Sequence, residues 1–272
     1  MGRLLMALLL LAGATAAGVA LVQGTAETPV ARAPSTIRLS PAASPPPQGR
    51  PTRLLAGRVI VLDAGHQLGN RSFPDEIATL VEAGGFQKPC NSTGTSTDAG
   101  YPEATFTFQV VRRAAHELRS LGATVVLTRP RNSGALWGPC VDARGRAGNR
   151  IGADVKVSVH ADGSWEGSGF HVIYPVNSPG WTDDVYEDSR ALARALRDAL
   201  RASGHHDSTY AGRDGLDQRR DLATLNLSDV PVAMVEAGNM RDATEAAMMQ
   251  SPAARRRYAD AIVTGVLTFL AP

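Results

Sequence analysis

Cysteine and lysine are scarce in this sequence of 272 residues, and neither sign of charge dominates it. The net charge of +2 argues against the strong positive field with which many proteins attract nucleic acids or membrane surfaces. Only two of the 28 basic residues are lysine, which together with many Ala and Gly reflects G+C-rich coding rather than a role for arginine. We find no internal repeat, second domain, heptad pattern or exposed apolar pattern, so we expect a single folded domain that is a monomer.

The N-terminus carries an export signal. Met1-Gly2-Arg3 is followed by an uncharged, mostly apolar stretch from Leu4 to Val22, and Gly24-Thr25-Ala26 offers small residues for cleavage. The stretch is also long enough to cross a bilayer as an uncleaved anchor. Small residues fill its second half, which favours a cleaved signal peptide over residues 1–26. With either outcome the rest of the chain is exported, and after cleavage we expect no membrane span.

A proline-rich segment follows, over residues 27–56. Seven prolines lie between Glu27 and Leu55, with little apolar periodicity, so the segment cannot bury enough surface to offset its ordering entropy. We interpret it as a flexible linker that leads into a folded domain over residues 57–272.

The only two cysteines, Cys90 and Cys140, lie in turn-rich stretches. Because an exported protein meets oxidising conditions, a Cys90–Cys140 disulfide is the expected state. Two free thiols, or two thiolates that bind a metal ion, are the alternatives.

From residue 57 onward, segments with strand character alternate with helical patterns, which is typical of an α/β fold. Phe106, Val110, Ala114 and Leu118 form the apolar stripe of one helix, which begins at Pro102 and stops at Gly122. Residues 67–100 look irregular. The expected strands cover 58–62, 123–128, 154–160, 169–174 and 232–236, and the other expected helices cover 141–151, 183–202, 242–249 and 252–270.

Three of these strands lead into a residue that can bind metal or move a proton: His66, His160 and Glu236. Side chains beyond the carboxyl ends of parallel strands gather at one edge of a sheet, so we expect these three to converge. Glu103 lies in the first turn of a helix, where the helix dipole favours an ionised carboxylate. Two imidazoles, one carboxylate ligand and one free carboxylate are the groups that a mononuclear zinc hydrolase needs.

Each of these residues also has an ordinary structural explanation. A histidine in a loop or at a strand end is often without a role, and Glu is common in the first turn of a helix. Glu236 is the most informative, because a carboxylate on a buried strand is costly unless it is paired. Arg220 is a candidate ion-pair partner for Glu236, or a group that orients a substrate carboxylate. His171 is either part of an active-site wall or a packed imidazole.

Several ordered motifs together resemble the zinc-dependent N-acetylmuramoyl-L-alanine amidases of the type 3 family, over about residues 57–270. They are Asp63-Ala64-Gly65-His66, Glu103 at the head of a helix, Val126-Leu127-Thr128-Arg129, the segment 149–154, Ser158-Val159-His160-Ala161-Asp162, and the segment 231–239 around Glu236. The resemblance implies a single α/β domain with a mixed, mostly parallel sheet of about six strands flanked by helices. It also implies that His66, Glu103 and His160 bind zinc and that Glu236 is the catalytic residue.

The sequence departs from the family pattern in two places. Ala64 stands where the family more often has proline, and residues 67–100 are longer than the usual spacing. Glu76 and Glu82 lie in that long stretch and compete with Glu103 for the role of ligand, although the helix position favours Glu103. The segment 204–221 is too short for the autoinhibitory helix of some relatives, so we expect an open site.

The activity implied by the resemblance is hydrolysis of the amide between N-acetylmuramic acid and L-alanine in peptidoglycan or its fragments, in the periplasm or cell wall of a bacterium. The missing binding module slightly favours soluble fragments. A non-catalytic relative would usually lack one of the four site residues. A zinc peptidase that cuts within the stem peptide is disfavoured because the chain has no His-x-His or His-Glu-x-x-His motif.

Overall fold

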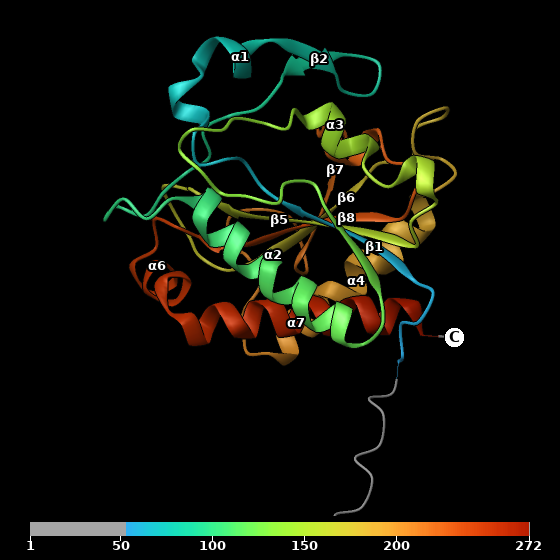
Figure 1. The fold of residues 1–272 in the computed structure, drawn as a ribbon. Coiled ribbons are helices and arrows are strands. Elements are labelled where there is room, and N and C mark those ends of the chain that lie inside the picture. The colour runs from blue at the N-terminus through green and yellow to red at the C-terminus, as the bar shows by residue number, and fades with distance from the viewer. Residues whose placement is uncertain (1–52, 272) are drawn as a thin grey trace, which may run out of the picture. The chain divides into compact units, whose positions relative to one another are not determined.

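A computed structural model describes residues 53–271 (Figure 1). The predicted signal peptide over residues 1–26 and most of the predicted linker over 27–56 lie outside the described residues. Within residues 53–271, no helix combines the length and the apolar character needed to cross a bilayer.

The centre of the domain is a six-stranded sheet with the strand order β4-β1-β5-β8-β6-β7. Every neighbouring pair is parallel except β6 and β8, which run antiparallel. The predicted mixed, mostly parallel sheet is therefore confirmed. The strands are β1 (Val59–Ala64), β4 (Thr124–Leu127), β5 (Val155–Asp162), β6 (His171–Pro175), β7 (Leu216–Arg219) and β8 (Val232–Asn239).

Long helices cover one face of this sheet, the lower face in Figure 1: α2 (Glu103–Ser120), α4 (Tyr186–Ala202) and α7 (Pro252–Leu270), with α6 (Ala243–Gln250) beside α7. The predicted apolar stripe of α2, from Phe106 to Leu118, is completely buried against the sheet and α7. Full burial of one such large side chain contributes roughly 1.5–3 kcal/mol. The main apolar core of the domain therefore lies on this face.

Short elements cover the opposite face, which leaves that side more open. They are α1 (Pro74–Ala78), the hairpin of β2 (Leu80–Glu82) and β3 (Gln87–Pro89), α3 (Val141–Arg146) and α5 (Ala223–Asn226), with 3₁₀ turns η1 (Asn70–Ser72) and η2 (Asn149–Ile151). The stretch 67–100, predicted to be irregular, thus contains a helical turn and a hairpin. The predicted helix over 141–151 is interrupted because Gly148 adopts a left-handed conformation, with φ of 98°.

Strand β7 is absent from the strands expected from the sequence. Its four residues, Leu216-Asp217-Gln218-Arg219, include only one apolar side chain. It lies at the edge of the sheet and pairs only with β6 among the described strands, so it needs no apolar pattern to be stable.

One of the two lysines, Lys156 in the central strand β5, is completely buried. Its ammonium donates hydrogen bonds to the carbonyls of Arg144 (3.4 Å) and Gly145 at the end of α3. Burial lowers the pKa of Lys156 to about 7. This side chain therefore links α3 to the central strand β5 through hydrogen bonds.

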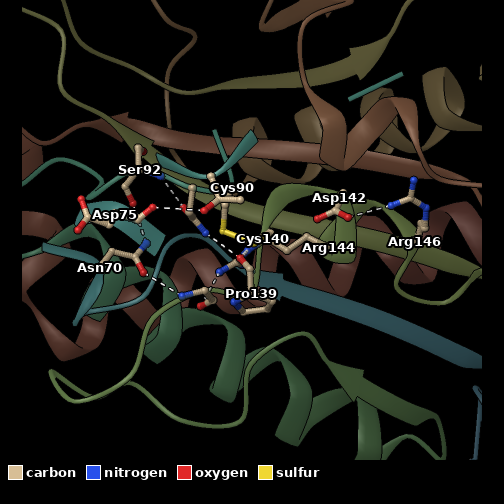
Figure 2. Close-up of a disulfide and its surroundings, with 12 residues drawn as sticks. Asn70, Asp75, Cys90, Ser92, Pro139, Cys140, Asp142, Arg144 and Arg146 are labelled. Carbon is tan, nitrogen blue, oxygen red and sulfur yellow. Dashed lines mark hydrogen bonds and ion pairs between the residues drawn. A yellow bond between two sulfur atoms is a disulfide. The ribbon is translucent and has the colours of Figure 1, made fainter. Parts of the chain in front are cut away.

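Cys90 and Cys140 form the predicted disulfide, which excludes the alternatives of free thiols and metal-bound thiolates (Figure 2). The bond joins the end of the β2–β3 hairpin to the start of α3. Beside it, the Val141 amide donates to the Cys90 carbonyl at 2.7 Å. The disulfide therefore links the β2–β3 hairpin covalently to α3.

Removal of this disulfide is expected to destabilise the domain substantially. The two cysteines are 50 residues apart, and closing a loop of that length restricts the unfolded chain by about 4 kcal/mol in the chain-entropy model. A Cys90→Ala/Cys140→Ala double variant should lose a comparable free energy of unfolding, measured by urea denaturation of the metal-free protein. A loss below about 1 kcal/mol would contradict this estimate of the loop contribution.

Candidate active site

His66 lies in the turn that follows β1, and its backbone is left-handed, with φ of 56°. The turn is held where it leaves the strand, because the Gly65 amide donates to the Val159 carbonyl of β5 at 2.9 Å. Gly65 lies flat on the imidazole of His160: a Cβ atom at residue 65 would be only 2.5 Å from the His160 Cε1 atom. The glycine therefore lets the two histidines come together.

Glu103 is the first residue of α2 and is almost completely buried. Its Oε1 atom lies 2.9 Å from His160 Nδ1, and its Oε2 atom lies 3.1 Å from His66 Nε2. The amides of Ala161 (3.2 Å) and Thr95 (2.9 Å) donate to the same carboxylate. Glu103 is thus fixed between the two imidazoles by backbone groups from β5 and the loop before α2.

Donor atoms of His66, Glu103 and His160 all lie within 4.8 Å of one another. Two nitrogens and one carboxylate oxygen, brought together in a mostly buried position, suit a divalent cation and zinc in particular. Burial acts to raise the pKa of Glu103, but the two imidazoles together outweigh it and hold that pKa well below its usual range. Burial lowers the pKa of His66, yet the charge of Glu103 overcomes it and raises that pKa. The group therefore attracts positive charge, as a metal site must.

The two other glutamates considered from the sequence are not part of this group. Glu82 uses its Oε1 atom to accept hydrogen bonds from the amides of residues 83, 84 and 85, in the turn of the β2–β3 hairpin. Glu76 is exposed on α1. The structure thus brings Glu103 to the two histidines, as its helix position predicts.

Glu236 lies in β8, directly beside His160 of β5 in the register of the sheet. Both strands continue past these residues, to Asp162 and Asn239, so the predicted strand ends were two to three residues too short. Within the described part of the chain, the buried Oε2 atom of Glu236 has no hydrogen-bond partner. Burial, then the charges of Asp162 and Glu103, raise the pKa of Glu236 well above its usual value. A buried carboxylate of this kind accepts a proton readily.

The structure does not bring Arg220 to this site. Arg220 is exposed, and the neighbouring Arg219 is the cation whose charge acts on Glu236 and opposes the rise of its pKa. Arg219 also holds Asp221 through two hydrogen bonds of 2.8 and 2.7 Å. Adjacent residues of an extended chain point to opposite sides, so the sequence could not decide between the two arginines. Arg220 is not among the residues that line the cavity and does not partner the Oε2 atom of Glu236 among the described residues; its role toward a substrate carboxylate stays a prediction.

Asp162 was missed from the sequence, although it follows His160 by two residues. Tyr210 donates a hydrogen bond of 3.0 Å to its Oδ2 atom, and the buried His171 places Nε2 at 3.8 Å from the same oxygen. His171 pairs with Glu236 across the antiparallel strands β6 and β8. His171 is thus a packed imidazole beside Glu236 and is not among the residues that line the cavity of the site.

Two buried arginines, Arg144 and Arg129, hold the turn that carries His66. Arg144 donates to the carbonyls of Ala64 and His66 at 2.7 Å each, while Arg129 donates to Ala64 at 2.9 Å and to Gly65 at 3.0 Å. All three carbonyls of the turn therefore accept hydrogen bonds from a guanidinium group. Arg144 also forms a buried ion pair with Asp63, at 2.6 Å. From the sequence, Arg129 was noted only as part of a family motif, and Arg144 was not singled out.

The loop that follows Cys90 also supports His66. The Ser92 carbonyl lies 3.2 Å from His66 Nδ1, and Asn70 fixes that carbonyl with a hydrogen bond of 2.7 Å (Figure 2). A backbone partner on one ring nitrogen orients the imidazole and leaves the other nitrogen free to bind a metal.

The three candidate ligands and Glu236 line one cavity of about 480 Å³. Its other walls combine apolar side chains with a few polar groups and one lysine at the rim: Val141, Leu222, Met234, Asn91, Thr224 and Lys88. The segment 204–221, where relatives were expected to differ, forms β7 and contains no helix in this structure. No autoinhibitory helix from that segment covers the cavity, as predicted.

An open α/β sheet that gathers two imidazoles and a carboxylate beside a second buried carboxylate defines a hydrolytic enzyme with a site that can hold one metal ion. Comparisons with known proteins agree with this class. A family model described as N-acetylmuramoyl-L-alanine amidase matches residues 60–268. The chain belongs to this family, the type 3 amidases, which are hydrolases that act on amide bonds.

Individual relatives are similar over most of the domain. N-acetylmuramoyl-L-alanine amidase Rv3717 of Mycobacterium tuberculosis is 42% identical over 219 residues, which cover 80% of this chain and 88% of the relative. The crystal structure of the amidase Ami1 from Mycobacterium smegmatis has a TM-score of 0.74 at 40% identity and covers 79% of this chain and 98% of that one. Ami1 from Mycobacterium abscessus has a TM-score of 0.73 at 41% identity and covers 80% and 100%. The family resemblance seen in the sequence is confirmed.

Proposed function

We propose that this chain is a zinc-dependent amidase that hydrolyses the bond between the lactyl group of N-acetylmuramic acid and L-alanine, in peptidoglycan or its fragments. The observation that carries the proposal is the convergence of His66, Glu103 and His160 within 4.8 Å, beside Glu236 with its buried Oε2 atom, in a chain of this family. The proposal includes export directed by residues 1–26 and action as a monomer, as the sequence predicts.

His66, Glu103 and His160 would hold the zinc ion. The donor set fits, because two imidazoles and a carboxylate are a common ligand set of catalytic zinc, which keeps a further position for water or substrate. When bound, zinc supplies Lewis-acid chemistry: it polarises a carbonyl group and lowers the pKa of water. The Ser92 carbonyl and the arginine-held turn keep His66 in the orientation that this role needs.

Glu236 would act as the general base and then as the general acid. Its unpaired Oε2 atom is available to take a proton from the attacking water, and the same proton can pass to the departing amine of L-alanine. Burial and the nearby charges of Asp162 and Glu103 make Glu236 a stronger base than an exposed carboxylate. The charge of Arg219 opposes this rise of the pKa.

Metal removal and product analysis test this proposal together. The zinc-loaded protein is expected to release from muramoyl-L-alanyl-D-isoglutamine a peptide that begins with L-alanine, identified by mass spectrometry. A chelator should abolish this release, zinc should restore it, and metal analysis should find one zinc per chain.

A His160→Ala variant should lose both zinc and activity, whereas His116→Ala serves as the matched control because His116 is exposed on α2. Cleavage within the peptide instead of before L-alanine would contradict the proposed specificity. Full activity after complete removal of metal would contradict the zinc dependence.

A further inference from the structure

A second hollow of about 570 Å³ lies beside the catalytic cavity. The two hollows share Gly94, Thr95 and Gly163 in their walls. Thr95 donates its amide to Glu103, so the shared wall is also part of the candidate metal site. A molecule whose reacting bond lies at Glu103 can therefore extend into either hollow.

Trp165 lies next to this second hollow, in contact with Arg241 of its wall, and is 85% exposed, more than any other large apolar side chain in the described part of the chain. Its indole ring lies against Arg241, whose guanidinium carbon is 4.0 Å from the ring centroid, and Arg241 lines the hollow. A side chain that is so exposed does not contribute to the core of the domain.

The loop that carries Trp165 is nevertheless fixed. Asn239, the last residue of β8, donates from its side-chain amide to the carbonyls of Ser164 (3.0 Å) and Gly167 (2.7 Å). The Ser164 hydroxyl donates to the Glu166 carbonyl at 2.7 Å. An indole that is held at a defined place and left open to solvent is suited to stack on a ligand, because little conformational freedom remains to be lost on binding.

The chemistry of the second hollow differs from that of the catalytic cavity. Arg71 and Arg241 offer hydrogen-bond donors there, beside the aromatic face of Trp165. A pyranose ring presents C–H groups on one face, which pack on an aromatic ring, and hydroxyl and acetamide groups at its edge, which accept hydrogen bonds. The catalytic cavity is lined by apolar side chains together with Lys88, Arg144 and Asp162, and Lys88 suits the carboxylate of an alanyl peptide.

We propose that the hollow lined by Arg71 and Arg241, together with Trp165 beside Arg241, is a carbohydrate-binding subsite that takes N-acetylated amino sugars on the glycan side of the scissile amide. This inference rests on the proposed function, because it places the substrate across the metal site with its sugars toward Trp165 and its peptide toward Lys88. We therefore expect the enzyme to prefer substrates with more than one sugar.

Paired tryptophan variants test the subsite. Trp165→Ala is compared with Trp181→Ala, a control in which another exposed tryptophan is removed from a separate hollow. Both are assayed on a muramoyl dipeptide with one sugar and on the same peptide carried by a glycan of four sugars. Trp165→Ala should lower kcat/KM on the longer substrate by about five- to tenfold, mainly through KM. It should leave the single-sugar substrate nearly unchanged, and Trp165→Phe should restore most of the loss.

A binding measurement separates this inference from the amidase activity. An oligosaccharide of N-acetylglucosamine and N-acetylmuramic acid without stem peptides should change the tryptophan fluorescence of wild type and Trp181→Ala, but not that of Trp165→Ala. Equal losses on the two substrates would mean that Trp165 contacts the peptide side and would overturn the subsite, as would equal behaviour of the two alanine variants. If no substrate is cleaved but the glycan still binds at Trp165, the proposed function fails and the subsite stands.

Discussion

Replacement of Glu236 by glutamine is expected to lower kcat by about 10²–10⁴-fold while zinc stays bound. The amide keeps the shape of the side chain but cannot take a proton from water. Glu236 is not among the three residues whose donor atoms converge, so the metal content should remain one zinc per chain. The measurement is turnover of a muramoyl-L-alanine peptide, with the zinc content of the same sample determined by metal analysis.

Glu76→Gln is the matched control for this experiment, because Glu76 is an exposed carboxylate on α1, outside the site. It should retain full activity. A Glu236→Gln variant that binds zinc and cleaves at the wild-type rate would show that another group moves the proton. Loss of zinc in that variant would instead make Glu236 a ligand.

The largest loss of stability from a single side chain is expected at Arg144. An Arg144→Met variant leaves Asp63 without an ion pair in a completely buried position, since Arg144 is the only cation at ion-pair distance from it among the described residues. Breaking a buried pair in this way costs about 3–5 kcal/mol. The variant also loses two of the hydrogen bonds that hold the His66 turn. Urea unfolding of metal-free protein at pH 7 measures the change.

The pH dependence of this effect follows from Asp63. Burial acts to raise the pKa of Asp63, but Arg144, Ser158 and Thr128 outweigh it and hold that pKa well below its usual value in the folded protein. The stabilisation is thus fully present above the ordinary carboxyl pKa of about 4 and is lost as the pH falls below it. The difference in the free energy of unfolding between wild type and Arg144→Met should therefore become smaller as the pH is lowered.

Arg146→Met is the control for Arg144→Met, because Arg146 lies in the same short helix but forms only an exposed ion pair with Asp142. Exposed pairs contribute about 0–1 kcal/mol, so this variant should unfold almost like wild type. If the two variants lost similar free energy, the buried pair would not have the importance assigned to it here.

The candidate metal site could be predicted because its parts have local signals. His160 and Glu236 belong to apolar strands and His66 follows one, and parallel strands bring such residues to one edge of a sheet. Glu103 begins a helix with a clear apolar stripe. These signals depend only on neighbours in the sequence, which is why four residues spread over 170 positions could be assembled before the fold was known.

The support around the site could not be predicted, because it depends on distant partners. Arg144 meets Asp63 across 81 positions, and Arg129 meets Ala64 across 65, in a chain where arginine is common and therefore uninformative. Arg219 and Arg220 differ by one position, and the sequence does not show that Arg219, the last residue of β7, is the one whose charge acts on Glu236. The β2–β3 hairpin has strands of three residues, too short to show an alternating pattern.

The contact between Gly65 and the ring of His160 restricts how this protein can be engineered. Any side chain at residue 65 begins with a carbon that would overlap the imidazole, while Arg129 holds the Gly65 carbonyl and Glu103 holds the His160 ring at 2.9 Å. A library that randomises the site for new substrates should therefore leave residue 65 unchanged and vary the apolar walls at Val141, Leu222 and Met234.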